Sequence, residues 1–240
     1  MRCPRADYPS RVALLLLIRH ALTDATGRRL SGRQPGHHLS EEGRAQAGRL
    51  AERLAPVHLA AVYASPLERC RETAEAVAAP RGIPIRLEPG VIEVEYGRWT
   101  GRPLAQLART ALWKRVQQVP SSVRFPDGER LDEVQHRAVE ALGRIAGTHP
   151  AGTAVVVTHA DVIRLALAHF AGIHLDLYQR LVVAPTSVTA VVLGDGVPRI
   201  LRVNDTGGLE DLAARRPREP RRGRGPAGRP GRPVAARVRG

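Results

Sequence analysis

The sequence predicts an α/β protein, a three-layer α/β/α sandwich with a mostly parallel central sheet. The first observation behind this prediction is that short aliphatic runs alternate with amphipathic stretches of helical period, as in strands joined by covering helices. The second is composition, since the 240 residues are 43% hydrophobic but only 3% aromatic. A core of Leu, Val and Ala suits helices packed on a Val-rich sheet, and a chain of this length can bury a sizeable core.

The composition divides the chain into three parts. Residues 1–10 are predicted to be an irregular lead-in, residues 11–212 a single folded domain, and residues 213–240 a disordered tail. The tail is rich in Arg, Pro and Gly and has almost no apolar side chains. Burial therefore cannot offset the entropy that the tail would lose on ordering.

The net charge of +14 is concentrated in that tail, where ten arginines face a single acid, Glu219. The rest of the chain is only mildly basic. An Arg-rich segment can bind RNA, DNA or anionic lipid through phosphate contacts, but this one lacks the interleaved aromatic rings of a base-stacking surface. We favour a solvated tail and expect neither nucleic acid nor a membrane as a partner.

Six short aliphatic segments are predicted as strands, namely Val12–Arg19 and residues 59–64, 83–87, 154–158, 187–193 and 198–203. Residues 12–18 follow basic residues and could imitate the apolar part of a secretory signal. They run directly into Arg19-His20 without a small-residue cleavage pattern, and no apolar run approaches the ~20 residues of a membrane span. We interpret this segment as a buried strand.

Four helices are predicted between the strands. The first begins after Ser40, a capping residue followed by two acids, and runs to Leu54. The second begins at Pro66 with Ser65 as its cap and runs to about residue 79. The other two cover residues 131–146 and 161–171.

Cys3 and Cys70 are the only cysteines. Two are too few for a disulfide framework or a multi-cysteine metal site, so a reducing cytoplasm is the expected location. We interpret Cys70 as a small apolar group packed on the sheet. The alternative is a thiol of low pKa near the start of a helix.

Two histidines follow predicted strands. Arg19-His20 ends the first strand, and His159 comes directly after the Val-rich strand 154–158. Ligands of open α/β sheets bind at the carboxyl ends of the strands. If these two strands are neighbours, about 4.8 Å apart, both imidazoles reach one pocket at the same edge.

Two further segments bring charge to that edge. Ser65 to Cys70 follows a strand and opens a helix, so N–H groups of the first turn and the guanidinium of Arg69 can hold an anion. Glu93 lies in the loop after the strand 83–87, where an acid can reach a leaving group.

With these motifs, the sequence resembles the histidine phosphatase superfamily, which includes the cofactor-dependent phosphoglycerate mutases. The resemblance extends over residues 12–203, nearly all of the predicted folded part. Its motifs are Arg19-His20-Ala21 for the family's Arg-His-Gly signature, Ser65 to Arg69 for its Ser-x-Leu-x-Arg pattern, Glu93 for the acid three residues before Tyr-Gly, and His159 for the second histidine.

The resemblance implies hydrolysis of a phosphomonoester of a small metabolite, with neither cofactor nor metal. His20 would attack phosphorus to form a phosphohistidine. Glu93 would protonate the departing alcohol and later take a proton from the attacking water. Arg19, Arg69 and His159 would hold the phosphoryl oxygens and stabilise the developing charge.

Two alternatives to a phosphatase stay open. A phosphoglycerate mutase-type phosphomutase would use the same residues, but the interval of 66 residues from Glu93 to His159 is short for the insertion of a mutase. We therefore favour the phosphatase. The other alternative is a non-catalytic module that binds phosphate or nucleic acid and uses the basic tail.

The substrate-binding positions implied by the resemblance are Thr26, Ser31, Gly32, Tyr96 and Ala160. The first three belong to a loop that would close over the phosphoryl group, and Thr26 stands where many relatives have asparagine. Tyr96 either lines the substrate pocket, together with Trp99, or packs in the core.

Other sequence features bear on the same site. Ala21 and Ala160 stand where glycine is usual, so their methyl groups would crowd the phosphate unless the backbone adjusts. Residues 95–110 and 112–127 are expected to be the loops that set specificity. His37-His38 in a polar loop is not expected to bind a metal.

Overall fold

The computed structural model describes residues 12–207, in which six strands form one sheet in the order β3-β2-β4-β1-β5-β6. The strands are β1 (Val12–Arg19), β2 (Ala61–Ala64), β3 (Ile85–Leu87), β4 (Thr153–Thr158), β5 (Val188–Gly194) and β6 (Arg199–Asp205). The four strands from β3 to β1 pair in parallel, whereas β5 and β6 pair antiparallel. The prediction of a mostly parallel sheet is confirmed. The predicted lead-in and tail lie outside the described residues.

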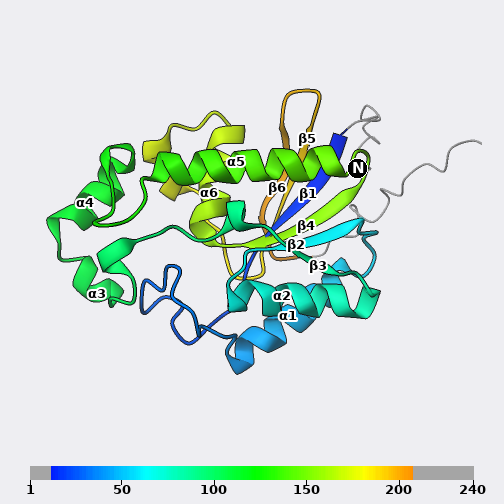
Figure 1. The fold of residues 1–240 in the computed structure, drawn as a ribbon, viewed down its shortest axis with the longest axis horizontal. Helices are drawn as coiled ribbons and strands as arrows, with labels where there is room; N and C mark the ends of the chain where they lie inside the picture. The colour runs from blue at the N-terminus through cyan, green and yellow to red at the C-terminus, as the bar shows by residue number, and fades with distance from the viewer. Residues whose placement is uncertain (1–11, 208–240) are drawn as a thin grey trace, which may run out of the picture.

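Helices cover both faces of this sheet, as Figure 1 shows: α5 and α6 lie on one face, and α1 and α2 on the other. The helices are α1 (Glu41–Leu54), α2 (Glu68–Ala78), α3 (Leu104–Leu107), α4 (Ala111–Gln118), α5 (Leu131–Thr148) and α6 (Ala160–Phe170). Short 3-10 turns cover Ala79–Arg81, Pro89–Val91, Gly97–Trp99, Pro120–Ser122 and Leu175–Arg180. The predicted three-layer sandwich is confirmed.

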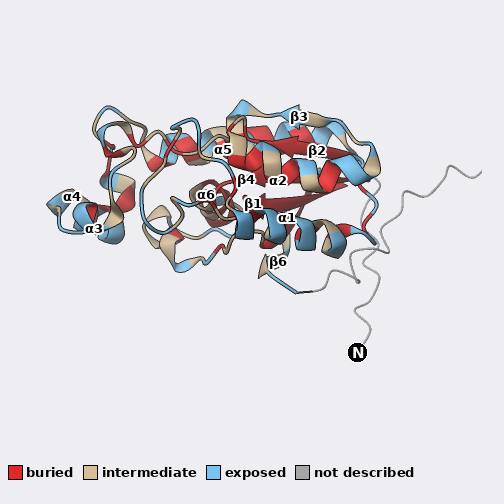
Figure 2. Cartoon of the chain, turned by 90° about the horizontal axis from the view of Figure 1, so that it is seen from below, coloured by how far each residue is buried: buried red, intermediate tan, exposed pale blue. Residues whose placement is uncertain are grey.

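The two faces of β1 explain why the chain forms this sandwich. Ala13, Leu15 and Leu17 are buried in the cluster that includes residues of α5 and α6, whereas Leu14 and Leu16 are buried in the cluster with α1 and α2. Successive side chains of a strand point to opposite faces, so an all-aliphatic strand needs cover on both. The central strands β1, β2 and β4 are accordingly buried in Figure 2, and the outer sides of α1 and α2 are exposed.

Of the two predicted helix caps, the structure has one and lacks the other. At α1 the prediction is confirmed, because the Gly43 N–H donates to the Ser40 hydroxyl over 3.0 Å. At α2 it is wrong: the helix begins at Glu68 after Leu67, with no side-chain cap. The Ser65 hydroxyl lies instead 2.8 Å from Nε2 of His159, so it is engaged at the sheet edge rather than at the helix.

The prediction that residues 95–110 and 112–127 are loops is also wrong in part, since these segments contain α3 and most of α4; their role in specificity stays a prediction. The Trp113 N–H donates to the hydroxyl of Thr110 over 3.1 Å and caps α4. Helices this short bury few side chains, so their apolar period is too weak to recognise in the sequence. Figure 1 shows both helices beyond the end of the sheet. No helix within residues 12–207 has the length and apolarity needed to cross a membrane.

The central strand gives a stability prediction. Leu16 of β1 is completely buried, so Leu16→Ala should lower the free energy of unfolding by about 2–5 kcal/mol through lost burial and a residual cavity. Val197→Ala is the control, because Val197 is 85% exposed between β5 and β6. Urea unfolding measures both, and equal midpoints for the two variants would contradict the assigned core.

Candidate active site

The two histidines predicted to share a site do lie together. β1 and β4 are parallel neighbours with Arg19 opposite Thr158, so the next residue of each strand is a histidine. The His20 N–H donates to the Thr158 carbonyl over 2.9 Å. The two imidazole centroids lie 5.3 Å apart, edge to face. The expectation that both rings reach one edge of the sheet is confirmed.

His20 is held in one tautomer. Its Nδ1 lies 2.7 Å from the carbonyl of Ala21, and because a carbonyl only accepts, Nδ1 carries the hydrogen and Nε2 keeps its lone pair. Burial, followed by the charge of Arg69, lowers the pKa of His20 to about 3. At neutral pH the ring is therefore an uncharged base with Nε2 available for attack.

His159 is fully buried and bonded through both ring nitrogens. Nη2 of Arg69 lies 3.3 Å from Nδ1, which must accept, so Nε2–H donates to the Ser65 hydroxyl over 2.8 Å. Burial, followed by the charge of Arg69, lowers the pKa of His159 well below its usual value. The thiol of Cys70 lies 3.4 Å from Nε2, and burial raises its pKa to about 12. Cys70 therefore packs as a small buried group and is not a thiol of low pKa.

Two guanidinium groups present unsatisfied donors at this edge. Arg69 is buried and donates through Nη2 to the Gly32 carbonyl over 2.8 Å, and Arg19 donates through Nη1 to the Val183 carbonyl over 2.8 Å. Within residues 12–207, however, Nη1 of Arg69 and Nε of Arg19 are buried without a hydrogen-bond partner. Leaving such donors unpaired is costly, and an anion would satisfy both.

Glu93 completes the group. Its Oε2 lies 3.6 Å from Nδ1 of His159, and its Oε1 accepts from the Val94 N–H over 3.0 Å. The side chain is 13% exposed. Burial, followed by the negative charge of Asp161, raises the pKa of Glu93 to about 7. A carboxyl with this pKa can both give and take a proton near neutral pH.

The backbone of Glu93 is held by two arginines that the sequence did not point to. Nε of Arg33 and Nη2 of Arg137 donate to the Glu93 carbonyl over 2.8 and 3.0 Å. Nη1 of Arg137 also donates to the carbonyls of Gly90 and Ile92, and both guanidiniums pair with Glu129. Neither arginine belongs to a motif around Glu93, so no local signal could have found them.

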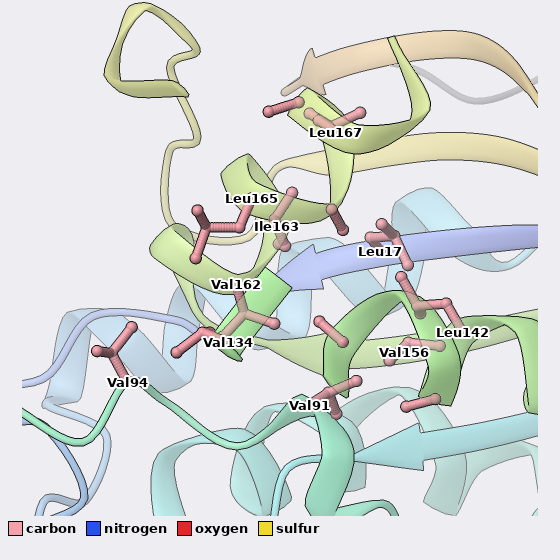
Figure 3. Close-up of a cluster of buried hydrophobic side chains, with 14 of the residues drawn as sticks. Leu17, Val91, Val94, Val134, Leu142, Val156, Val162, Ile163, Leu165 and Leu167 are labelled. Atoms are coloured by element: carbon pink, nitrogen blue, oxygen red, sulfur yellow. The ribbon is translucent and has the colours of Figure 1, made fainter. Parts of the chain in front are cut away.

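The segments that carry the site are anchored in one hydrophobic cluster. Figure 3 shows Leu17, which precedes Arg19-His20, in the same cluster as Val91 and Val94 on either side of Glu93. Val162, which follows His159 by three residues, belongs to it as well. Packing of this kind fixes where the polar side chains can lie.

The predicted substrate-binding residues have different surroundings. The Thr26 hydroxyl accepts from the Thr23 N–H over 3.0 Å and so closes its own turn. The Ser31 carbonyl accepts from the Gln34 N–H. Tyr96 is buried and donates to Asp161 over 2.6 Å, and Ala160 is the first residue of α6. Their contact with a substrate stays a prediction.

The alanine and glycine positions near the site have clear packing reasons. Ala21 is buried in a small cluster with Leu39 and Ala47, so its methyl group is accommodated rather than strained. Gly32 has φ 53°, and a Cβ there would lie 3.0 Å from the Thr100 hydroxyl. A side chain at residue 32 would therefore disturb the carbonyl that binds Arg69.

The adjacent histidines of the polar loop have separate partners. His38 pairs with Glu72, and Nε2 of His37 lies 3.3 Å from the Gln34 side-chain oxygen. Among residues 12–207, no group of three or more His, Cys, Asp or Glu side chains is arranged to hold a metal ion.

Two uncharged imidazoles, the buried guanidinium of Arg69 and the partly buried guanidinium of Arg19 at the carboxyl edge of the sheet are typical of an α/β enzyme that binds a phosphoryl group. The chain belongs to the histidine phosphatase superfamily (branch 1), which matches residues 15–206. The predicted family is thereby confirmed, and with it the enzyme class, a phosphoric monoester hydrolase.

The chain is similar to individual proteins over most of its length. Phosphoserine phosphatase 1 of Hydrogenobacter thermophilus is 29% identical over 196 residues, which cover 80% of this chain and 92% of that protein. Bifunctional protein Rv2228c of Mycobacterium tuberculosis is 35% identical over 208 residues, but these cover 81% of this chain and only 54% of that protein. The solved structure of YhfR from Bacillus stearothermophilus has a TM-score of 0.75 and 33% identity, covering 83% of this chain and 99% of that one.

Proposed function

We propose that the protein hydrolyses phosphate monoesters of small metabolites through a phosphohistidine formed on His20. The observation that carries the proposal is the unprotonated Nε2 of His20 beside two guanidiniums, the buried Arg69 and the partly buried Arg19, each with an unpaired N–H. A dianionic phosphoryl group is the ligand that such donors suit, and the neutral imidazole is the nucleophile that it needs. The cytoplasm is the expected location, since Cys70 is a free thiol.

In the first step, Nε2 of His20 forms a bond to phosphorus while the ester P–O bond breaks. The proton on Glu93 moves to the departing oxygen, so the product leaves as an alcohol rather than as an alkoxide. Arg19 and Arg69 donate to the phosphoryl oxygens. His159 was expected to hold these oxygens as well, but its two ring nitrogens bond to Arg69 and Ser65, so we assign it the role of keeping the Arg69 guanidinium in place.

In the second step, water attacks the phosphohistidine. Glu93, now ionised, takes the proton from that water, the P–N bond breaks, and inorganic phosphate leaves. His20 is again a neutral base and Glu93 is again protonated, so the cycle closes. A pKa near 7 lets one carboxyl serve in both steps.

Phosphate release is the test of this function. Incubation with p-nitrophenyl phosphate and a panel of alkyl phosphates should liberate inorganic phosphate in proportion to the alcohol formed. A phosphomutase would instead convert phosphoglycerate to an isomer with little free phosphate. A non-catalytic module would release none and would show salt-sensitive binding of nucleic acid.

The pH dependence of alkyl ester hydrolysis should follow the protonation state of Glu93. Because burial raises the pKa of this acid to about 7, the proton donor is present below that pH and is lost above it. When kcat/KM of each ester is referred to the concentration of its dianion, the ratio of the alkyl ester to the p-nitrophenyl ester should fall about tenfold per pH unit above pH 7. His20 stays neutral down to about pH 3, so the ratio should be flat on the acid side. A ratio that rises above pH 7 would contradict the assignment.

Arg137 should act as a positioning residue for Glu93. Arg137→Lys keeps the charge but loses the fork that binds the carbonyls of residues 90, 92 and 93, so kcat for alkyl esters should fall about tenfold. The p-nitrophenyl ester, whose leaving group needs no proton, should be nearly unaffected. Arg144→Lys, on an exposed position of the same helix, is the control. If Arg137 had a purely structural role, Arg137→Lys would lower kcat equally for both kinds of ester.

A further inference from the structure

A pocket of about 230 Å³ is lined by most of the few aromatic side chains in the sequence. Five of the eight aromatic residues in the sequence line it, namely Tyr96, Trp99, Trp113, Phe125 and Tyr178. Their rings contact one another: Trp99 lies 6.0 Å from Trp113 and 5.5 Å from Phe125, centroid to centroid. The sequence left open whether Tyr96 and Trp99 line a pocket or pack in the core, and they do both.

This pocket adjoins the proposed reaction site. Asp161, which lines it, comes two residues after His159 on α6, and Tyr96 comes three residues after Glu93. The negative charge of Asp161 acts directly on Glu93, the group that would protonate the leaving oxygen. From a phosphorus that faces His20, a leaving group that extends past Asp161 and Tyr96 would enter the aromatic pocket.

The size and the walls of the pocket suit a flat ring. An apolar cavity of about 150 Å³ can hold benzene, so about 230 Å³ accommodates one ring with a short linker. Aromatic walls add edge-to-face and offset contacts to the burial of such a ring. A short polar chain would leave most of this apolar surface without contacts.

The charges at the pocket disfavour an anionic leaving group. Oδ1 of Asp161 lies 3.1 Å from Nη1 of Arg164, and Oδ2 accepts from the Tyr96 hydroxyl over 2.6 Å. The charges of Arg164 and Asp161 thus largely offset each other, so the pocket offers a carboxylate no net positive charge. Nε of Arg164 is buried and has no partner within residues 12–207, so a neutral acceptor could use it.

We infer that the substrate is a phosphate monoester whose leaving group carries an uncharged flat ring, rather than a short carboxylate-bearing chain such as phosphoserine. The inference rests on the proposed function, because hydrolysis at His20 places the leaving group in this pocket. It concerns only which ester is hydrolysed best.

Three primary esters with similar leaving oxygens test it: 2-phenylethyl phosphate, ethyl phosphate and phosphoserine. The value of kcat/KM for the phenylethyl ester should exceed that for ethyl phosphate about tenfold or more, as burial of a phenyl ring predicts, and phosphoserine should be the poorest. Trp113→Ala should reduce the ratio of kcat/KM for the phenylethyl ester to that for ethyl phosphate severalfold. Asp161→Asn should raise kcat/KM for phosphoserine relative to that for ethyl phosphate. Val119→Ala, exposed at the end of α4, should keep the wild-type ratio.

A preference for phosphoserine over the phenylethyl ester, or an unchanged ratio in Trp113→Ala, would overturn the inference. Binding separates it from the proposed function. His20→Ala protein should bind 2-phenylethylphosphonate about tenfold more tightly than ethylphosphonate, measured by tryptophan fluorescence. Preferential binding of the phenylethyl compound without any hydrolysis by the unaltered protein would contradict the proposed function but support the inferred preference for a ring. Hydrolysis of all three esters at equal efficiency would support the proposed function but contradict that preference.

Discussion

His20→Ala should lower kcat for every phosphate ester by a factor on the order of 10⁴ or more, because it removes the atom that forms the bond to phosphorus. The size of the effect should not depend on the leaving group, since both good and poor leaving groups pass through the same phosphohistidine. Steady-state hydrolysis of p-nitrophenyl phosphate and of an alkyl phosphate measures it. The melting temperature should change little, because the ring makes only one side-chain hydrogen bond in the described part of the chain.

His136→Ala is the matched control for that experiment. His136 is an exposed imidazole on α5 that pairs with Glu140 rather than with any residue of the site. Its removal should leave kcat and KM within about twofold of the unaltered protein. Substantial turnover remaining in His20→Ala, with its fold intact, would exclude covalent catalysis at this residue.

The second large effect is expected at Glu93. Glu93→Gln keeps the shape of the side chain and its acceptor for the Val94 N–H, but it removes the transferable proton. For alkyl phosphates kcat should fall about 10²–10⁴-fold, the usual contribution of general acid catalysis. For p-nitrophenyl phosphate the first step needs no proton donor, so phosphohistidine should form rapidly and then accumulate, because its hydrolysis has lost the base. Burst kinetics in a stopped-flow instrument would show this.

Glu95→Gln provides the comparison for this substitution. Glu95 lies two residues further on, is about one-third exposed, and lies 3.8 Å from Arg33. Its carboxyl has no role in proton transfer, so neither the leaving-group dependence nor the burst should change. Similar losses for both variants would mean that residue 93 acts through the loop rather than through its proton.

The parts of the fold that the sequence predicted well are those governed by burial. β1 and β4 are continuous aliphatic runs, which must lie in the middle of a covered sheet, and the residue after each run then falls at its carboxyl edge. This is why the sequence alone predicts that His20 and His159 lie together. Glu93 and Arg69 followed because recognisable motifs frame them.

Other features depended on contacts between distant segments, which leave no local pattern. Ser65 has the residue type of a helix cap, yet its hydroxyl bonds to His159, a residue 94 positions away. Arg137 reaches the Glu93 carbonyl from α5, across 44 positions of sequence. Asp161 is the exception, since an acid two residues after His159 could have been recognised as a neighbour of the leaving group.

The central claim is that phosphorus becomes bonded to His20. Mixing the protein with a radiolabelled phosphate ester and quenching within the first turnover should trap label that is stable to alkali and labile to acid, as a phosphoramidate is. Peptide mapping should locate it on the fragment that contains His20, and it should be absent from His20→Ala protein. Label on His159, or turnover without any protein-bound phosphate in Glu93→Gln protein, would contradict the account.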